Sequence, residues 1–371
     1  MDAPRDRRPV LVPLGGFLGA GKTTLILAAS RVLAGRGLRA AAILNDQGSD
    51  LADTRFVSAN GVAADEVTGG CFCCRFSELV EAAERLGAQA PEVIFAEAVG
   101  SCTDISATML QPLKLYYAGE FRVAPYSVLV DPRRARELAA EDGASDWSFL
   151  FRKQIEEADL ICFNKADLGG GAPEEVSAPG RHLLAWMDEV QAGAPRRYLS
   201  ALMGQGVAEW LDEILAGHVE SAGKILDLDY QRYARAEASL AWLNCRAAIT
   251  LATPLSPAMV LGPLVEALDG ALTAQSLRIA HLKVVGESSA GYLKVSITAN
   301  GEEPQVQGML DASPATRHEL FLNVRAAGEP ETLQGIVERE LAGVAGAIDV
   351  LAIDCFRPAP PAPQHRIGVA Q

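Results

Sequence analysis

A glycine-rich run after the first apolar stretch of the chain has the residue types and spacing of a phosphate-binding loop. The run Gly16–Thr23 follows the apolar residues Val10–Leu14 and precedes a helical pattern. Backbone N–H groups of such a loop converge on a phosphate at the helix N-terminus, where the helix dipole also favours negative charge. We expect the Lys22 ammonium to contact the β- and γ-phosphates, the Thr23 hydroxyl to bind Mg²⁺ and Thr24 to contact the α-phosphate. The loop backbone around the phosphates comes from Gly16, Gly19, Ala20 and Gly21.

A second polar group, Asn164-Lys165-Ala166-Asp167, closes a later apolar strand. The Asp167 carboxylate can accept hydrogen bonds from both the ring N–H and the exocyclic amine of guanine, whereas adenine offers no such donor pair. We therefore predict GTP as the nucleotide, with Lys165 lying over the base and Asn164 bracing the loop. Ser200, at the end of the next strand, is expected to close over the base.

Two further strand ends carry carboxylates that could respond to the γ-phosphate. Asp46 and Glu97 are assigned to holding Mg²⁺ or orienting the attacking water, and the Gly100 amide to sensing the γ-phosphate. The alternatives are a turn-forming role for Asp46 and a solvated strand end for Glu97. Asp131, followed by Pro132, is instead predicted to cap a helix.

Three cysteines within four residues, Cys71, Cys73 and Cys74, form the most unusual local pattern in the chain. Thiolates select Zn²⁺ or another late transition ion, and three protein ligands leave one coordination position open. We expect a metal site here; the alternative is a buried or redox-active thiol cluster. Cys102 is a candidate fourth ligand. The remaining cysteines are expected in apolar strands, and two histidines are less favoured as metal relays: Cys162, Cys245, Cys355, His281 and His365.

The elements needed to position these residues alternate between apolar strands and helices over the first two hundred or so residues, which predicts an α/β domain with a mostly parallel sheet. The carboxyl ends of its strands should meet at one site. A smaller α+β domain of ferredoxin-like order with an extra strand is expected to follow. The predicted boundaries are a P-loop GTPase domain at 1–222, a linker at 223–239, the second domain at 240–356 and a proline-rich tail at 357–371. The strands expected in the first domain are Val10–Leu14, Ala40–Leu44, Val93–Ala96, Val123–Val130, Leu160–Phe163 and Arg197–Leu199.

The composition of the chain limits the classes of partner that it is expected to bind. The chain has 33 Lys and Arg against 47 Asp and Glu, a formal net charge of −14, which disfavours nucleic acid as a partner. No apolar run approaches the ~20 residues that cross a bilayer, and the charged start leads into no signal-like core. We expect no membrane association and a cytoplasmic location, in line with reduced cysteines. The sequence is compatible with a homodimer.

Taken in order, the phosphate loop, Gly-Gly-Cys-Phe-Cys-Cys at 69–74, Glu-x-x-Gly at 97–100 and Asn-Lys-Ala-Asp at 164–167 resemble the CobW-like metallochaperone GTPases, relatives of HypB and UreG. The likeness covers roughly the first 220 residues. It implies a GTPase that binds a transition metal, Zn²⁺ or Co²⁺ foremost, at the cysteine motif. It also implies that GTP hydrolysis delivers the metal to a client metalloprotein or cofactor-bearing enzyme.

The sequence departs from the family pattern in two places, and two other functions fit the same residues. Asn45-Asp46-Gln47-Gly48 stands where relatives carry Asn-Glu-Phe-Gly, and the second domain has no histidine-rich stretch. One alternative is a GTP-dependent activator of a corrinoid or metal-dependent enzyme, as in cobalamin-related members, with a regulatory metal. The other is a metal sensor with low turnover.

Overall fold

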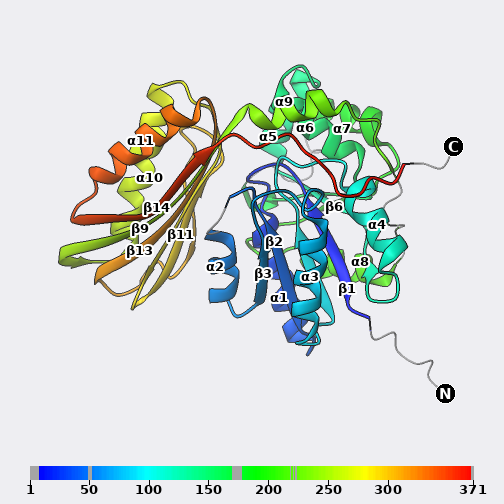
Figure 1. Cartoon of the computed structure of the whole chain (residues 1–371), viewed down its shortest axis with the longest axis horizontal. Helices are drawn as coiled ribbons and strands as arrows, with labels where there is room; N and C mark the ends of the chain where they lie inside the picture. Colours follow the sequence, from blue (N-terminus) through cyan, green and yellow to red (C-terminus); the bar gives the residue numbers. More distant parts are fainter. Residues whose placement is uncertain are drawn as a thin grey trace. The chain divides into compact units, whose positions relative to one another are not determined.

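The computed structural model describes residues 8–48, 52–168, 178–217, 219, 221 and 224–368. The chain forms two compact units. The first comprises residues 1–46, 57–236 and 360–371, and the second comprises residues 47–56 and 237–359. Figure 1 shows the two groups of elements.

The first unit is built on a parallel sheet with the strand order β3-β2-β4-β1-β6-β7-β8, and β5 also pairs with β1. This is the P-loop NTPase fold that the sequence predicts. Its strands are β1 (Val10–Gly15), β2 (Ala40–Asn45), β3 (Ala63–Val67), β4 (Val93–Glu97), β5 (Arg122–Val123), β6 (Ser127–Val130), β7 (Leu160–Phe163) and β8 (Arg196–Tyr198).

Helices lie between these strands and after the last of them. They are α1 (Lys22–Gly35), α3 (Phe76–Gly87), α4 (Gln111–Tyr116), α5 (Pro132–Glu141), α6 (Asp146–Glu156), α7 (Ala178–Gln191), α8 (Val207–Ala216) and α9 (Tyr230–Ala238). A π-helical turn at Ser106–Leu110 runs into α4, and a 3-10 turn forms at Ala166–Leu168. β1, β4, β6 and β7 are buried along their length because βα crossovers cover both faces of a parallel sheet, which explains why their sequences are mostly apolar runs.

The structure differs from the predicted strands in two places. Val123–Val130 is not one strand but two, β5 and β6, separated at Ala124-Pro125-Tyr126. Pro125 lacks an N–H and cannot continue a ladder of hydrogen bonds. The edge strand β3 was not predicted, because it carries Asp65 and Glu66 and is mostly half-exposed.

The second unit is an antiparallel sheet with two helices on one face. Its elements are β9 (Leu240–Leu255), α10 (Pro257–Ala274), β10 (Ile279–Ser288), β11 (Gly291–Ile297), β12 (Gln305–Gly308), β13 (Ala315–Ala327), α11 (Pro330–Ala342) and β14 (Ala347–Phe356). Figure 1 shows α10 and α11 side by side, and they contact each other and the sheet. The strand order is β12-β11-β10-β13-β9-β14. Two βαβ units interleave as β14-β9-β13-β10, the expected ferredoxin-like order, with two extra strands rather than one.

The observed units differ from the predicted domain boundaries in three ways. Residues 47–56, which include the first part of α2 (Ala52–Ala59), group with the second unit. There Asp53 forms ion pairs with the buried Lys283 and Lys294, and Phe56 packs edge-on against Tyr292. Most of the expected linker is α9, and the tail from Pro360 onward groups with the first unit. These contacts join segments that are distant in the chain, so periodicity along the sequence does not show them.

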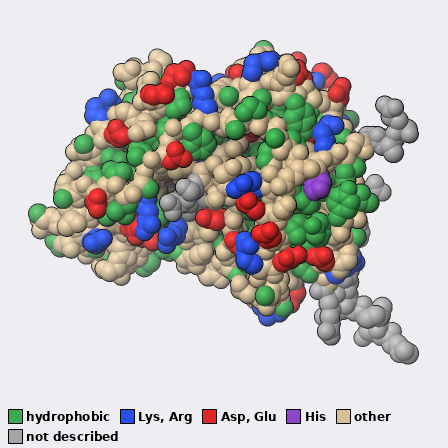
Figure 2. Space-filling view, viewed as in Figure 1, with side chains coloured by type: hydrophobic (Ala, Val, Ile, Leu, Met, Phe, Trp, Pro, Cys, Tyr) green, Lys and Arg blue, Asp and Glu red, His purple; other side chains and the backbone are tan. Residues whose placement is uncertain are grey.

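In the parts of the chain that the structure describes, no helix combines the length and the apolar composition needed to cross a bilayer. Figure 2 shows acidic and basic side chains interspersed over one face of the molecule.

Candidate functional site

The loop between β1 and α1 has the backbone geometry of a phosphate cradle. Gly16, Gly19 and Gly21 all have positive φ angles, 123°, 78° and 95°. A Cβ atom on Gly16 would lie 2.2 Å from the Leu129 carbonyl oxygen, so only glycine fits there. Lys22 is 6% exposed, and its Nζ donates to Gly16 O at 2.9 Å, which places the ammonium group within the loop. The loop therefore has the backbone geometry and the buried cation expected of a phosphate-binding loop.

The Thr23 hydroxyl lies against the carboxylate of Glu97. Its Oγ1 donates to the two carboxylate oxygens of Glu97 at distances of 2.9 and 3.1 Å. Parallel pairing brings the two residues together, because Leu14 at the end of β1 is in register with Glu97 at the end of β4. A hydroxyl and a carboxylate oxygen next to bound phosphates are the donors that Mg²⁺ takes from protein, so this pair fits the ion. Thr24 follows on the first turn of α1 and is half-buried.

Gly100 approaches the phosphate loop closely. A Cβ atom on this glycine would lie 2.8 Å from Leu18 Cδ2. Its carbonyl oxygen accepts a hydrogen bond of 2.9 Å from the buried amide of Gln154, which also donates to Cys102 O at 3.0 Å. Gln154 therefore positions the segment after Glu97. Sequence analysis missed this residue because a glutamine inside an amphipathic helix carries no distinctive pattern.

The predicted base-binding residues gather at the end of β7. Asn164 Nδ2 donates to Ala20 O at 2.8 Å, and its Oδ1 accepts from Ala201 N at 2.9 Å, so it joins the phosphate loop to the segment after β8. Asp167 is exposed and accepts a hydrogen bond from Ser200 Oγ at 2.5 Å. This contact holds the carboxylate at the sheet edge where the base is expected.

Lys165 lies in the left-handed region, with φ 63°, and pairs with Asp131 at 2.8 Å. Asp131 also accepts from Arg133 N at 2.9 Å and caps α5, as the sequence predicts. Burial alone would raise the pKa of the Asp131 carboxyl, but Lys165 and the hydrogen bonds outweigh burial and hold the pKa below its usual range. The ion pair fixes the stem of Lys165 beside the 3-10 turn that carries Asp167.

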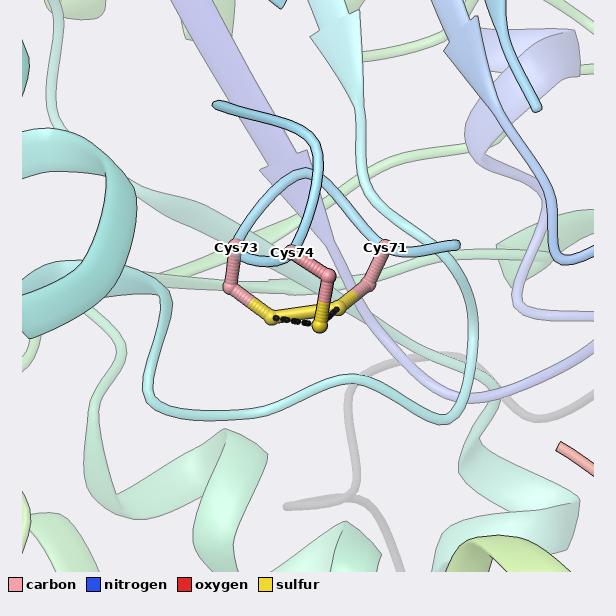
Figure 3. A group of neighbouring side chains, drawn as sticks. All are labelled: Cys71, Cys73 and Cys74. Atoms are coloured by element: carbon pink, nitrogen blue, oxygen red, sulfur yellow. Dashed lines mark hydrogen bonds between the residues drawn. A yellow bond between two sulfur atoms is a disulfide. The ribbon is translucent and has the colours of Figure 1, made fainter. Parts of the chain in front are cut away.

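The three predicted metal ligands lie together in the turn before α3, as Figure 3 shows. Their ligand atoms are all within 4.8 Å of one another. Cys74 Sγ lies 3.3 Å from Cys71 Sγ and 3.7 Å from Cys73 Sγ. Cys71 and Cys73 are joined as a disulfide, whereas the sequence predicted reduced, metal-binding cysteines; the tight turn brings the two side chains together. A soft metal ion takes thiolates, so metal binding requires both sulfurs in reduced form.

Asn45, at the end of β2, holds the loop that carries these cysteines. Its Nδ2 donates to Val67 O at 2.9 Å and Gly70 O at 2.7 Å, and its Oδ1 accepts from Phe72 N at 2.8 Å. Sequence analysis assigned the neighbouring Asp46, which is half-exposed and whose backbone N–H donates to Val67 O at 3.2 Å. Asn45 is therefore a positioning residue. The sequence indicates only that it is the polar residue at the end of a buried strand.

Residues 10–190 match the family model described as the CobW/HypB/UreG nucleotide-binding domain. Residues 10–190, just under half of the chain, are therefore a nucleotide-binding domain of the CobW/HypB/UreG family. This assignment confirms the resemblance seen in the phosphate loop, the cysteine motif and Asn164–Asp167.

Solved structures of related proteins show lower similarity. HypB from Helicobacter pylori in complex with nickel is 15% identical, with a TM-score of 0.43, and the match covers 57% of this chain and 87% of that one. HypB from Archaeoglobus fulgidus is 21% identical, with a TM-score of 0.39 and coverage of 57% and 91%. Zn(II)-bound YjiA GTPase from E. coli is 16% identical, with a TM-score of 0.36 and coverage of 91% and 99%. The family assignment rests on the match of residues 10–190 rather than on these structures.

The other cysteines do not join the group formed by Cys71, Cys73 and Cys74. Within the described residues, the metal-competent group consists of the three sulfurs of residues 71–74, so Cys102, proposed as a fourth ligand, is not brought to it. Burial raises the pKa of the Cys245 and Cys355 thiols to about 11 and raises that of Cys162 further. These thiols favour their neutral form, in agreement with the structural role that the sequence predicts.

A buried carboxyl group, Glu157, lies behind the Gly100 segment. It accepts from Thr103 Oγ1 at 3.0 Å and Ser106 N at 3.3 Å. Burial, followed by the charge of Asp104, raises the pKa of Glu157 to about 8. The folded chain therefore keeps Glu157 protonated at neutral pH, because its charged form is costly in the interior.

This pKa predicts a pH-dependent stability. A carboxyl whose pKa is raised in the folded state contributes fully below its unfolded pKa and loses that contribution as the pH rises through about 8. Thermal denaturation from pH 5 to 9 should show the wild-type melting temperature falling as the pH rises to about 8 and levelling off above that, with a flatter profile in Glu157→Gln. Glu156→Gln, at a half-buried ion pair with Lys153, is the control and should keep the wild-type slope. An unchanged slope in Glu157→Gln would contradict the assignment.

Proposed function

We propose that this chain is a metallochaperone that binds GTP and Mg²⁺ at the phosphate loop and a transition-metal ion at Cys71, Cys73 and Cys74. GTP hydrolysis changes the affinity for the metal, and the ion passes to a client metalloprotein or cofactor-bearing enzyme. Zn²⁺ or Co²⁺ is the expected ion, since thiolates select late transition metals. The reduced state of the cysteines that this activity needs favours the cytoplasm.

The chain's own residues perform the following steps. Lys22 binds the β- and γ-phosphates and opposes the negative charge that develops on them. Thr23 and Glu97 would hold Mg²⁺, which would supply positive charge to offset the charge of the phosphates. Gly100 presents its backbone N–H to the γ-phosphate, and Asp46 lies at the neighbouring strand end, where it can orient the attacking water.

Guanine recognition falls to the end of β7. Asp167 accepts from the two donors on the guanine edge, and Ser200 orients the Asp167 carboxylate. Lys165 covers one face of the base. Asn164 keeps this segment at a fixed distance from the phosphate loop through its bond to Ala20.

The contact of Asn45 with the cysteine loop is the observation that carries the proposed coupling. Asn45 directly precedes Asp46, and its side chain binds Gly70 and Phe72 on either side of Cys71. A change at the end of β2 when the γ-phosphate leaves would alter these hydrogen bonds and thereby the positions of the sulfurs. This gives the two sites a shared element through which each ligand affects the other.

The coupling predicts different metal affinities in the two nucleotide states. With the cysteines kept reduced, competition against a chromophoric chelator should give Co²⁺ or Zn²⁺ affinities that differ at least about fivefold between a non-hydrolysable GTP analogue and GDP. Asn45→Ala should diminish the difference. Asn60→Ala, which removes an exposed contact with Arg31, should retain it.

Equal affinities in both nucleotide states would overturn metal delivery by hydrolysis. A metal ion that stays unexchanged through many turnovers would instead assign it a regulatory role. A full affinity difference in Asn45→Ala would keep the linkage but place its path elsewhere.

A further inference from the structure

Residues 360–368, an extended segment at the far end of the chain, contact the cysteine loop within the first unit. The Gln364 N–H donates to Cys73 O at 2.9 Å. The side-chain oxygen of Gln364 accepts from Ser77 N at 2.9 Å and Ser77 Oγ at 3.1 Å, at the start of α3. One residue of the tail therefore joins the cysteine loop to the helix that follows it.

The tail also contacts a sulfur directly. The Ala362 N–H donates to Cys74 Sγ, with a nitrogen to sulfur distance of 3.2 Å. Groups that donate hydrogen bonds to a metal-binding side chain orient it and stabilise the charge on it, and their loss commonly weakens metal binding. Ala362 lies between Pro361 and Pro363, whose fixed φ angles restrict the backbone around this donor.

An ion pair with a buried carboxylate anchors the tail beyond Gln364. Arg366 Nε donates to Asp104 Oδ2 at 2.8 Å, and Arg366 Nη2 donates to Leu226 O at 2.9 Å. Asp104 is 1% exposed and also accepts from Tyr230 OH at 2.6 Å. The Ile367 N–H donates to Ala107 O at 2.9 Å. A buried carboxylate that loses its cationic partner is costly, so this anchor holds the tail firmly.

His365 packs between the anchor and the loop. Its ring lies edge-on to Phe76, with centroids 5.0 Å apart, and 5.6 Å from the ring of Tyr116. The described residues that could share a metal ion are the three cysteines alone, so His365 lies outside that group. Packing, rather than metal relay, accounts for its position.

We propose that residues 360–367 are a positioning clamp for the metal site, in which Ala362 orients Cys74, Gln364 fixes the loop against α3 and Arg366 anchors the segment. The clamp rests on the proposed metal site and adds to it residues that set metal affinity without touching the metal. Its proline-flanked donor contacts the cysteine loop, and its anchor holds the same segment at the buried Asp104.

The sharpest test removes one N–H group. Ala362→Pro deletes the donor to Cys74, and Ala359→Pro places the same change in the matching Pro-Ala-Pro context of residues 358–360. Reduced protein is titrated with Co²⁺, and the sulfur-to-cobalt charge-transfer absorption is followed with chelator competition. Affinity should fall about tenfold in Ala362→Pro, with a changed absorption envelope, and stay at the wild-type value in Ala359→Pro.

A second pair of variants tests the anchor. Arg366→Ala breaks the pair with Asp104, whereas Arg357→Ala breaks only an exposed pair with Glu329 in the second unit. Arg366→Ala should lower Co²⁺ affinity and speed hydrogen exchange at the Cys74 and Arg75 amides, which close the loop on Cys71 O at 2.9 and 3.0 Å. Arg357→Ala should change neither. Unchanged GDP binding shows that the variants are folded.

The outcomes separate the clamp from the metal site. The clamp is overturned if the wild type takes up one Co²⁺ and both Ala362→Pro and Arg366→Ala titrate identically to it. The metal site is retained in that case. Wild type that binds no Co²⁺ would overturn the metal site, and the clamp is then judged by exchange alone. Equal exchange in Arg366→Ala and Arg357→Ala would refute it.

Discussion

Lys22→Ala is expected to lower the rate of GTP hydrolysis by about 100- to 1000-fold. The Lys22 ammonium is buried and held inside the loop by its hydrogen bond to Gly16 O at 2.9 Å. A water molecule that took its place in the variant would not supply its positive charge. Phosphate release at saturating GTP and Mg²⁺ measures the effect. The loss should appear in kcat, because charge develops on the phosphates during bond cleavage.

Lys153→Ala is the matched control. Lys153 pairs with Glu156 on α6 and should leave hydrolysis unchanged. A Lys22→Ala rate within a few-fold of wild type would mean that hydrolysis does not take place at this loop. A metal-stimulated component of the rate that survives in Lys22→Ala would point to the same conclusion.

Asp167→Asn is expected to weaken GTP binding by about 100-fold or more and to favour xanthosine triphosphate. An asparagine places an N–H₂ group against one of the two guanine donors, whereas xanthine offers a carbonyl oxygen at that position. Equilibrium binding and hydrolysis of both nucleotides measure the switch. Ser200, whose hydroxyl contacts Asp167 at 2.5 Å, can serve either side chain.

Asp212→Asn, at an exposed pair with Arg36, provides the control and should keep the preference for GTP. Weakened binding of both nucleotides by the same factor would indicate damage to the loop rather than base recognition. Unaltered GTP binding in Asp167→Asn would remove Asp167 from the base site.

The sequence predicts this fold well where burial determines the pattern. β1, β2, β4 and β7 are buried apolar strands, and the structure places them within a residue of the predicted bounds. The edge strand β3 escapes such analysis because Asp65 and Glu66 reduce its apolar signal. In the second unit, the short β12, with its alternating half-buried and exposed residues, was missed for the same reason.

The site residues form two groups: those that belong to contiguous motifs and those that act through contacts between distant segments of the chain. The phosphate loop, the cysteine motif and Asn164–Asp167 are contiguous, so their spacing carries the chemistry. Asn45, Gln154 and the tail act through contacts between distant segments, and nothing local distinguishes an asparagine that holds a metal loop from one that ends a strand. The disulfide between Cys71 and Cys73 likewise depends on how the turn orients the two side chains.

The hydrogen bond between Ala362 and Cys74 spans 288 residues of chain, which has a consequence for biosynthesis. At about 5–20 residues per second, a ribosome needs roughly 15 to 60 s after the cysteine motif to produce the segment that contacts it. During that interval the nascent GTPase domain presents its three sulfurs to cellular thiols and metal ions without the tail. The order of synthesis therefore gives each new molecule one period in which its cysteine motif exists before the segment that contacts it.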